Sequence, residues 1–343
     1  MALKEMIVKV VEGRSLRETE AAEAMADIVE GVGTPAQIAA FVVALRMKGE
    51  TAEEIAGLAR VMRRHATRVD VGMDVVDIVG TGGDGARTFN ISTISAFVVA
   101  AAGGRVAKHG NRGVTSACGS ADILEALGVA IDLPPEGVVR CVRETGFGFM
   151  FAPLYHPAMR HAVVPRREIG VRTVFNLLGP LTNPAGAAAQ VTGVAAGEVA
   201  PAIAEVHRLL GAHRALVVHG GDGLDELSIF EVTQVYDVAD GQVRSYEVRP
   251  EDVGIERAST DAIRGGTVEV NLQLARSVLA GEPGPPRDVV LLNAAAGLVV
   301  AELVEDLKAG VALAREVIDS GKARATLEQV RALSSRLRAE GDA

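Results

Sequence analysis

The chain has 343 residues, of which 48% are hydrophobic and 23% are charged. This length suits two domains or one large α/β unit, and the apolar fraction argues against a disordered chain. Because 35 basic and 44 acidic residues leave a formal net charge of −9, and aromatic residues make up only 3% with no Trp, nucleic acid is a poor candidate partner. Nucleic-acid sites need basic surfaces for phosphates and aromatic rings for bases.

Cysteine usage and the apolar segments indicate a reducing, cytoplasmic setting. Cys118 and Cys141 stand outside any CxxC or His-rich motif, which argues against a zinc site or a disulfide framework and predicts small semi-buried thiols. Glu5 and Glu12 interrupt the first apolar stretch, as in an amphipathic helix and not a signal peptide. The most apolar segment, residues 289–301, is too short to cross a bilayer, so no membrane partner is expected.

The first part of the chain, up to about residue 70, is predicted to be helical throughout. A hydroxyl residue followed three positions later by Glu or Gln is typical of the capping box that begins a helix. Gly49 is predicted to end the second of these helices, since glycine is favoured just past a helix end. The predicted boxes are Ser15 with Glu18, Thr34 with Gln37, and Thr51 with Glu54.

From residue 74 the pattern changes to short apolar strands that alternate with helices. Such alternation implies a mainly parallel sheet with right-handed crossovers. Two alternating runs around Ala239-Asp240-Gly241 predict a hairpin that is antiparallel to the rest. Strands are predicted at residues 74–80, 105–110, 147–151, 188–196 and 214–220, and helices at 91–102, 202–210, 289–304, 307–320 and 323–338. Residues 171–184 are predicted to be a connector, because Gly-Pro and Asn-Pro pairs break them.

A glycine turn, residues 80–85 (Gly-Thr-Gly-Gly-Asp-Gly), follows the first predicted strand and precedes a helix. Glycine allows positive φ and a close approach of backbone amides to an anion, and the helix N-terminus adds its dipole. Four glycines exceed what a tight βα turn needs, so phosphate binding is favoured over that alternative. The turn matches neither the Walker A motif nor GxGxxG. Asp84 would repel phosphate unless it faces a metal or a hydroxyl group.

Hydrogen-bonding side chains continue beyond the turn. Asn90, Ser92 and Thr93 stand at the start of a helix, where N-capping and ligand contact are equally plausible readings. The end of the next strand is predicted to form an anion clamp, because ligands bind at the carboxyl ends of strands in open α/β sheets; a solvated basic turn is the alternative. The clamp comprises Lys108, His109, Gly110, Asn111, Arg112 and Gly113, and Thr115, Ser116, Gly119 and Ser120 extend it.

Two further groups of charged residues are candidates for function. Asp225 and Glu226 follow a predicted strand; adjacent carboxylates are commonly solvated, but opposite two anion-binding loops they suit Mg²⁺, which favours carboxylate and phosphate oxygens. His219 precedes them and is interpreted as structural. Arg166, in a helical stretch, is either an exposed helix charge or a guanidinium that pairs with a substrate carboxylate.

Together these residues resemble the anthranilate phosphoribosyltransferases over nearly the whole chain. The combination of KHGNR at residues 108–112, GTGGD at 80–84 and the LDE loop at 224–226 is the most specific part. Pyrimidine nucleoside phosphorylases share the architecture but have a Lys-x-Ser-x-Arg pattern at the clamp. One departure is Ile229, Phe230, Glu231 and Val232, where the family reads close to Thr-Gly-Pro-Thr. It puts the shape of this loop in question more than metal binding.

The resemblance implies an α/β fold in which a small helical domain is joined by a hinge to a larger domain with a mainly parallel sheet. It implies a helical domain of residues 1–72, to which about 158–186 return, an α/β domain of 73–157 and 187–343, and a homodimer through the helical parts. The implied substrates are anthranilate and phosphoribosyl pyrophosphate (PRPP). The PRPP site would comprise Gly80, Gly83, Asp84, Thr88, Asn90, Ile91, Ser92, Thr93, Lys108, Ser116 and Ser120.

The resemblance also implies Mg²⁺ held by Ser92, Asp225 and Glu226, and anthranilate bound by Gly80, His109, Asn111 and Arg166, near a Gly179-Pro180 turn. Displacement of pyrophosphate from ribose builds charge on both fragments, so we expect stabilisation by Mg²⁺ and Lys108 and no acid–base dyad. The alternatives are nucleoside phosphorolysis on the same fold and a non-catalytic nucleic-acid-binding relative.

Overall fold

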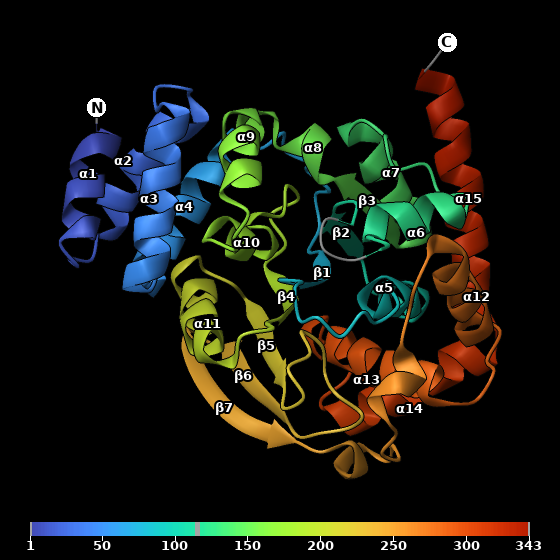
Figure 1. Cartoon of the computed structure of the whole chain (residues 1–343). Coiled ribbons are helices and arrows are strands. Elements are labelled where there is room, and N and C mark those ends of the chain that lie inside the picture. The colour runs from blue at the N-terminus through green and yellow to red at the C-terminus, as the bar shows by residue number, and fades with distance from the viewer. Residues whose placement is uncertain (1, 114–116, 342–343) are drawn as a thin grey trace.

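The computed structural model describes residues 2–113 and 117–341, and four N-terminal helices pack together in it (Figure 1). They are α1 (Ala2–Val11), α2 (Glu18–Val29), α3 (Pro35–Lys48) and α4 (Ala52–His65). α1 packs on α3 and α2 packs on α4. Met25 and Phe41 are fully buried in the apolar core between them. The prediction of a helical N-terminal part is confirmed.

Two predicted capping boxes are confirmed. The Thr34 hydroxyl accepts a hydrogen bond from the amide of Gln37 at 3.3 Å, and the Thr51 hydroxyl accepts one from the amide of Glu54 at 3.3 Å. The N3 side chains return the contact to the cap amides. Gly49 ends α3, as predicted.

The first predicted capping box, Ser15 with Glu18, is wrong. Arg17 is the cap residue of α2, and the Glu20 carboxylate accepts from the Arg17 amide at 3.0 Å. Glu20 is held at this position by an ion pair with Lys9 of α1. A contact between two helices therefore decides which acidic residue caps α2, and the local sequence pattern does not reveal it.

A seven-stranded sheet forms the centre of the α/β part, in the order β3-β2-β1-β4-β5-β6-β7. Its strands are β1 (Val76–Gly80), β2 (Val106–Gly110), β3 (Phe147–Phe151), β4 (Ala189–Gly193), β5 (Arg214–Gly220), β6 (Thr233–Ala239) and β7 (Gln242–Val248). β1 to β5 pair in parallel, whereas β6 is antiparallel to β5 and β7 is antiparallel to β6. The predictions of a mainly parallel sheet and of the hairpin around Asp240 are confirmed.

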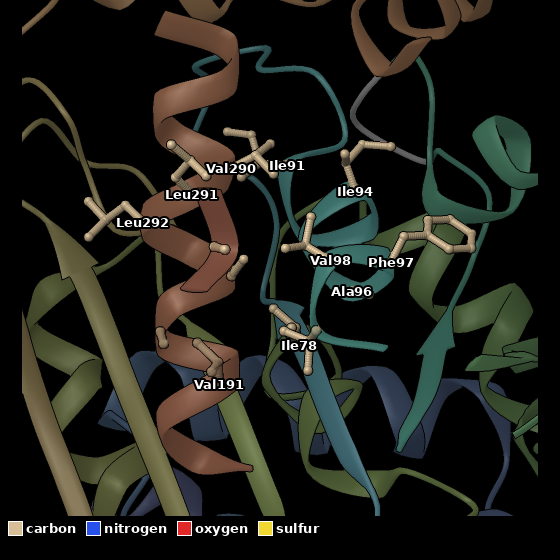
Figure 2. Close-up of a cluster of buried hydrophobic side chains, with 14 of the residues drawn as sticks. Ile78, Ile91, Ile94, Ala96, Phe97, Val98, Val191, Val290, Leu291 and Leu292 are labelled. Atoms are coloured by element: carbon tan, nitrogen blue, oxygen red, sulfur yellow. The ribbon is translucent and has the colours of Figure 1, made fainter. Parts of the chain in front are cut away.

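Helices cover the faces of this sheet. α5 (Ile91–Ala101) and α13 (Pro285–Val300) pack against each other, and Figure 2 shows their side chains gathered around Ile78 of β1 and Val191 of β4. The remaining helices of the α/β part are α6 (Ser120–Ala126), α7 (Pro135–Thr145), α8 (Ala152–Tyr155), α11 (Ala200–Leu209), α12 (Val268–Leu279), α14 (Leu307–Asp319) and α15 (Lys322–Gly341).

The segment after α8 returns to the N-terminal helices. α9 (Arg160–Ile169) packs on α2 and α3, and α10 (Phe175–Leu178) packs on α4. Ala162, Phe175 and Leu178 are buried in the same apolar core as the first four helices. The predicted connector at 171–184 contains α10 and a 3₁₀ turn at Pro180–Thr182, because its Gly-Pro and Asn-Pro pairs interrupt any longer helix.

Four of the parallel strands end in glycine at the same edge of the sheet. Gly80, Gly110, Gly193 and Gly220 are the last residues of β1, β2, β4 and β5. Loops that follow such strands meet beyond this edge. Cys118 and Cys141 are buried and form no disulfide bond within the described residues. None of the helices in the described part of the chain combines the length and the apolar composition needed to span a membrane.

Candidate functional site

The glycine turn and the Asp225 loop meet in one site beyond the strand ends. The amide of Gly82 donates a hydrogen bond to Asp225 Oδ2 at 2.6 Å. A Cβ atom at Gly80 would lie 2.2 Å from Asp225 Oδ2, and one at Gly193 would lie 1.6 Å from the Asp225 carbonyl oxygen. Only glycine permits backbone to approach this closely. The structure thus brings together two motifs that lie 143 residues apart in the sequence.

Negative charge accumulates in this site. Burial raises the pKa of Asp225 and of Glu226, and the carboxylate of Asp84 raises both further. Within the described residues, no Lys, Arg or His side chain forms an ion pair with these three carboxylates. A bound cation would relieve the repulsion between them.

The donor set fits a hard divalent cation. Carboxylate and hydroxyl oxygens from Asp225, Glu226 and Ser92 are the atoms that Mg²⁺ prefers. Across residues 2–113 and 117–341, no three His, Cys, Asp or Glu side chains converge into a complete metal site. This fits Mg²⁺, which is usually bound by one or two carboxylates and completed by waters and substrate phosphates.

Lys108 supplies a buried positive charge beside these carboxylates. Its side chain is 1% exposed, and its ammonium donates hydrogen bonds to the Ile78 carbonyl and to Ser92 Oγ, the latter at 3.3 Å. Burial lowers the pKa of Lys108, whereas Asp77 and Glu226 act in the opposite direction. The backbone of Ser92 also acts on Glu226 and lowers its pKa. Lys108, Ser92 and Glu226 therefore lie together.

Four residues of the predicted PRPP site lie at or just before the start of α5, and their side chains differ in burial and in hydrogen-bond partners. Asn90 precedes α5 without capping it, because its amide group donates to the Cys118 carbonyl at 3.1 Å and its Oδ1 accepts from Asn271 at 3.0 Å. The Ile91 side chain is buried in the core, which leaves only its backbone for a ligand. Thr93 Oγ1 is buried and has no hydrogen-bond partner within the described residues. Thr88 is half-buried and forms an isolated β-bridge.

The anion clamp is only partly formed as predicted. Ser120 Oγ donates to the Asn111 carbonyl at 3.3 Å, so these two residues lie together. Arg112 is not a free cation, because its guanidinium pairs with Asp122 at 3.0 Å and with Glu125. Lys108 is therefore the clamp cation that is available to an anion. Thr115 and Ser116 lie outside the described residues.

Two buried imidazoles lie beside the connector. The rings of His109 and His156 are 5.0 Å apart between centroids. Burial lowers the pKa of His109 to about 3 and that of His156 to about 4, so both are neutral at physiological pH. His219, interpreted as structural, has its Nδ1 2.8 Å from the Val194 carbonyl oxygen.

Arg166 lies on an exposed face of α9. Its guanidinium stands 5.3 Å from the centre of the Phe175 ring, a distance typical of a cation–π contact. It forms no ion pair with any described residue. Its charge is thus available to an external carboxylate.

Two residues near the site were not indicated by the sequence patterns. Arg172 donates to the Thr81 carbonyl at 3.1 Å. Asp77 is fully buried, accepts a hydrogen bond from Asn183 at 2.7 Å, and has its pKa raised to about 6 by burial. The sequence did contain a signal for each of them. A charged residue within a mostly apolar stretch needs a specific partner when that stretch is buried.

Residues 229–232, where the sequence departs from the family pattern, pack partly into the core. Ile229 and Phe230 are buried in the main core. Ser228 Oγ shapes the loop, since it donates to Asp222 at 2.8 Å and accepts from the amides of Phe230 and Glu231 at 2.9 and 3.1 Å. The unusual apolar residues therefore serve the core of the α/β part.

Comparisons with known proteins agree on one family. Residues 4–66 match the helical bundle domain of a glycosyl transferase family, and residues 72–324 match the a/b domain of a glycosyl transferase family. A protein of Symbiobacterium thermophilum named anthranilate phosphoribosyltransferase is 56% identical over 339 residues, which cover 98% of this chain and 99% of that protein. One of Chloroflexus aurantiacus with the same name is 56% identical over 336 residues, 97% of this chain and 99% of that one.

Solved structures give the same result. The anthranilate phosphoribosyltransferase of Thermus thermophilus superposes with a TM-score of 0.91 at 49% identity and covers 96% of this chain and 99% of its own. That of Saccharomyces cerevisiae, in complex with PRPP and Mg, superposes with a TM-score of 0.89 at 29% identity, with 97% and 98% covered. The chain therefore belongs to the anthranilate phosphoribosyltransferases, within this glycosyl transferase family.

Proposed function

We propose that the protein transfers the 5-phosphoribosyl group from PRPP to the amino group of anthranilate. The products are N-(5-phosphoribosyl)anthranilate and pyrophosphate, and the reaction is the second step of tryptophan biosynthesis. The observation that carries this proposal is the contact between the glycine turn and the loop of Asp225 and Glu226, the acidic loop. In this contact the Gly82 amide donates a hydrogen bond to Asp225 Oδ2 at 2.6 Å. The names of the relatives and the PRPP and Mg of the yeast structure support it.

The proposed site for PRPP, the donor of the phosphoribosyl group, comprises backbone amides, hydroxyl groups and one ammonium group. Glycine at positions 80 and 83 lets the turn approach a phosphate closely. The proposed PRPP contacts are Gly80, Gly83, Asp84, Thr88, Asn90, Ile91, Ser92, Thr93, Lys108, Ser116 and Ser120. Of these, Thr93 supports the proposal with a buried hydroxyl that has no partner among the described residues.

The proposed chemistry is displacement at C1 of the ribose through an oxocarbenium-like transition state. Mg²⁺, held by Ser92, Asp225 and Glu226, would neutralise charge on the pyrophosphate leaving group. Lys108 stabilises the same charge from a buried position, where electrostatic interactions are stronger than in water. No acid–base dyad is needed, because an aromatic amine is neutral at physiological pH and can attack directly.

The proposed acceptor site orients anthranilate through its carboxylate. Arg166 would pair with this group, which a guanidinium binds with two parallel hydrogen bonds, while Gly80, His109 and Asn111 complete the contacts. His109 is neutral because burial lowers its pKa to about 3, so it would contribute shape and hydrogen bonding without charge. Alignment of two bound substrates contributes about 7–11 kcal/mol at the well-oriented limit.

We further propose that the chain moves as two domains. The helical domain would comprise residues 1–72 and about 158–186, and the α/β domain 73–157 and 187–343. The packing of α9 on α2 and α3 supports this division. The helical parts would also form a homodimer, and the enzyme would act in the cytoplasm.

The test is the loss of anthranilate fluorescence when the protein is mixed with PRPP and Mg²⁺. We expect loss with all three components present and none when PRPP is left out. Phosphorolysis of pyrimidine nucleosides, with no consumption of anthranilate, would contradict the proposal.

A further inference from the structure

Arg172 reaches from the connector to the glycine turn. It lies between α9 and α10, just after Gly170, which ends α9 with a φ of +67°. Because α9 packs on α2 and α3, the connector is fixed to the N-terminal helices. The turn is fixed to the sheet, since the Thr81 amide donates to the Gly193 carbonyl at 2.9 Å. Arg172 therefore links two parts of the molecule that come from different segments of the chain.

The contact is close and involves the backbone of the turn. Arg172 Nη2 donates to the Thr81 carbonyl at 3.1 Å. A Cβ atom at Gly83 would lie 1.6 Å from Arg172 Nη1 and 2.5 Å from its Cζ. The guanidinium thus occupies the space that a side chain at this position would need.

One peptide group of the turn is held from both sides. The carbonyl of Thr81 and the amide of Gly82 belong to the same planar peptide unit. The carbonyl accepts from Arg172, and the amide donates to Asp225 Oδ2 at 2.6 Å. These two contacts fix the rotation of this unit, so the Gly82 N–H is directed to the acidic side of the site.

The groups around Arg172 carry both signs of charge. Asp84 and Asp225 face it from the α/β part, and Arg46 faces it from α3. All except Asp225 line a cleft of about 250 Å³ between α3, the turn and the end of β4. Arg46 repels the guanidinium and the two carboxylates attract it. Attraction by the carboxylates of Asp84 and Asp225 thus favours the position of Arg172 over the turn.

We propose that Arg172 is a positioning residue that orients the glycine turn for the phosphates of PRPP. It also ties this turn to the connector that follows α9, the helix of the proposed anthranilate-binding residue Arg166. This inference rests on the proposed function. It assigns no contact between Arg172 and either substrate. Its effect passes through the peptide unit of Thr81 and Gly82.

The first test is the affinity for PRPP in the presence of Mg²⁺, measured by calorimetry alongside steady-state kinetics. In Arg172→Ala, we expect the affinity for PRPP to fall about tenfold or more, the effect of losing a hydrogen bond to a charged group. The KM for anthranilate should change less than about twofold. Arg172→Lys keeps the charge and one donor, and should recover part of the loss. Arg167→Ala removes an exposed guanidinium of α9 and is the matched control.

The second test uses a pair of glycines in the turn. Gly83 and Gly85 have φ values of +76° and +73°, but a Cβ at Gly83 would meet Arg172, whereas one at Gly85 would meet nothing within 4 Å. Gly83→Ala should therefore weaken PRPP binding more than Gly85→Ala. In the Arg172→Ala background, this difference should become smaller, because the clash with the guanidinium is gone while the proposed contact of Gly83 with PRPP remains. Such non-additivity is the mark of direct coupling.

The outcomes separate this inference from the proposed function. If the wild-type protein binds PRPP but consumes no anthranilate, the proposed function fails and the affinities for PRPP still decide the role of Arg172. Unchanged affinity in Arg172→Ala, or additive effects of Arg172→Ala and Gly83→Ala, would overturn the inference. A lower melting temperature of Arg172→Ala with unchanged affinity would also overturn it, because the role would then be structural only.

Discussion

The Lys108 ammonium is almost fully removed from water but uses only part of its hydrogen-bonding capacity. It donates to the Ile78 carbonyl and to Ser92 Oγ among the described residues, and an ammonium carries three donors. A buried charge with a spare donor is costly unless a ligand completes it. This makes Lys108 the strongest single candidate for an anion contact.

We predict that Lys108→Ala weakens PRPP binding by about tenfold to a hundredfold, the range expected for hydrogen bonds to a charged group. Calorimetric titration with PRPP and Mg²⁺ measures this effect. The melting temperature should fall as well, because the buried carboxylates of Asp77 and Glu226 lose a compensating positive charge. Unchanged affinity would remove Lys108 from the donor site.

Arg166 and Arg167 are neighbours on α9, and both are exposed. We predict that Arg166→Ala raises the KM for anthranilate about tenfold or more and leaves the KM for PRPP within about twofold, since a guanidinium–carboxylate pair would be lost. Arg167→Ala should behave like the wild type in the same steady-state assay. Equal effects of Arg166→Ala on both substrates would remove it from the acceptor site.

For single residues, the sequence predicted where a side chain lies in the fold better than it predicted the residues with which that side chain pairs. Asp225 was recognised because it follows a strand, and strand ends meet at one edge of the sheet. Arg112 also follows a strand, but Asp122 and Glu125 of α6 neutralise it, and no local pattern reveals that pairing. Arg172 was missed because its contact with Thr81 spans 91 residues. The roles of the site residues stay predictions until substrates are bound.

Among the elements, Glu54 joins three helices. Its carboxylate, fully buried, accepts from the Leu16 amide ahead of α2 at 2.8 Å, pairs with Lys48 of α3 at 3.0 Å, and accepts from the Thr51 amide that caps α4. The sequence predicted the last of these contacts only. The other two depend on how the helices pack.

We predict that Glu54→Ala lowers the free energy of unfolding by about 3–5 kcal/mol, because it leaves Lys48 and two amides without their partner in a buried place. Urea denaturation measures the change. Glu53→Ala, at the exposed neighbouring position, should have an effect below about 0.5 kcal/mol. A similarly small loss of unfolding free energy in both variants would contradict the prediction, because the contacts of Glu54 with Leu16 and Lys48 would then contribute little to stability.

The limits of element prediction have a clear physical cause. Apolar periodicity predicts that a helix exists, because burial of one face requires it. The residue at which a helix begins or ends depends on contacts with other elements. At the start of α2, for example, Glu20 completes the cap while it forms an ion pair with Lys9 of α1. The short α10 within the predicted connector has its Phe175 and Leu178 buried against the N-terminal helices, which the broken local pattern does not foretell.

For the whole molecule, buried neutral histidines connect stability to pH. His207 is 1% exposed, its Nε2 lies 2.9 Å from Thr192 Oγ1, and burial lowers its pKa to about 3. Between this value and the unfolded value of about 6.5, the unfolded chain binds a proton that the folded chain excludes. The free energy of unfolding therefore falls as pH falls through this range.

We predict that His207→Gln reduces this dependence by about 1.4 kcal/mol per pH unit below about pH 6, which corresponds to one titrating group. Urea denaturation at a series of pH values measures the slope. The same exchange at His213, whose side chain is 66% exposed, is the control. An identical slope in His207→Gln and wild type would contradict the prediction.

The arrangement of the sheet is what assembles the site. Because β2, β1, β4 and β5 are four successive parallel strands of the sheet, the loops that follow them converge at one edge even though they are far apart in the sequence. The central claim is that two of these loops, the glycine turn and the acidic loop, together bind PRPP with Mg²⁺.

The most direct test is the calorimetric affinity for PRPP, with and without Mg²⁺, in the wild type and in the double variant Asp225→Asn, Glu226→Gln. We predict that Mg²⁺ tightens PRPP binding by about tenfold or more in the wild type and has no effect in the double variant. The double variant should melt no lower than the wild type, since burial raises the pKa of both carboxyl groups and repulsion from Asp84 raises both further. Equal dependence on Mg²⁺ in the two proteins would contradict the account.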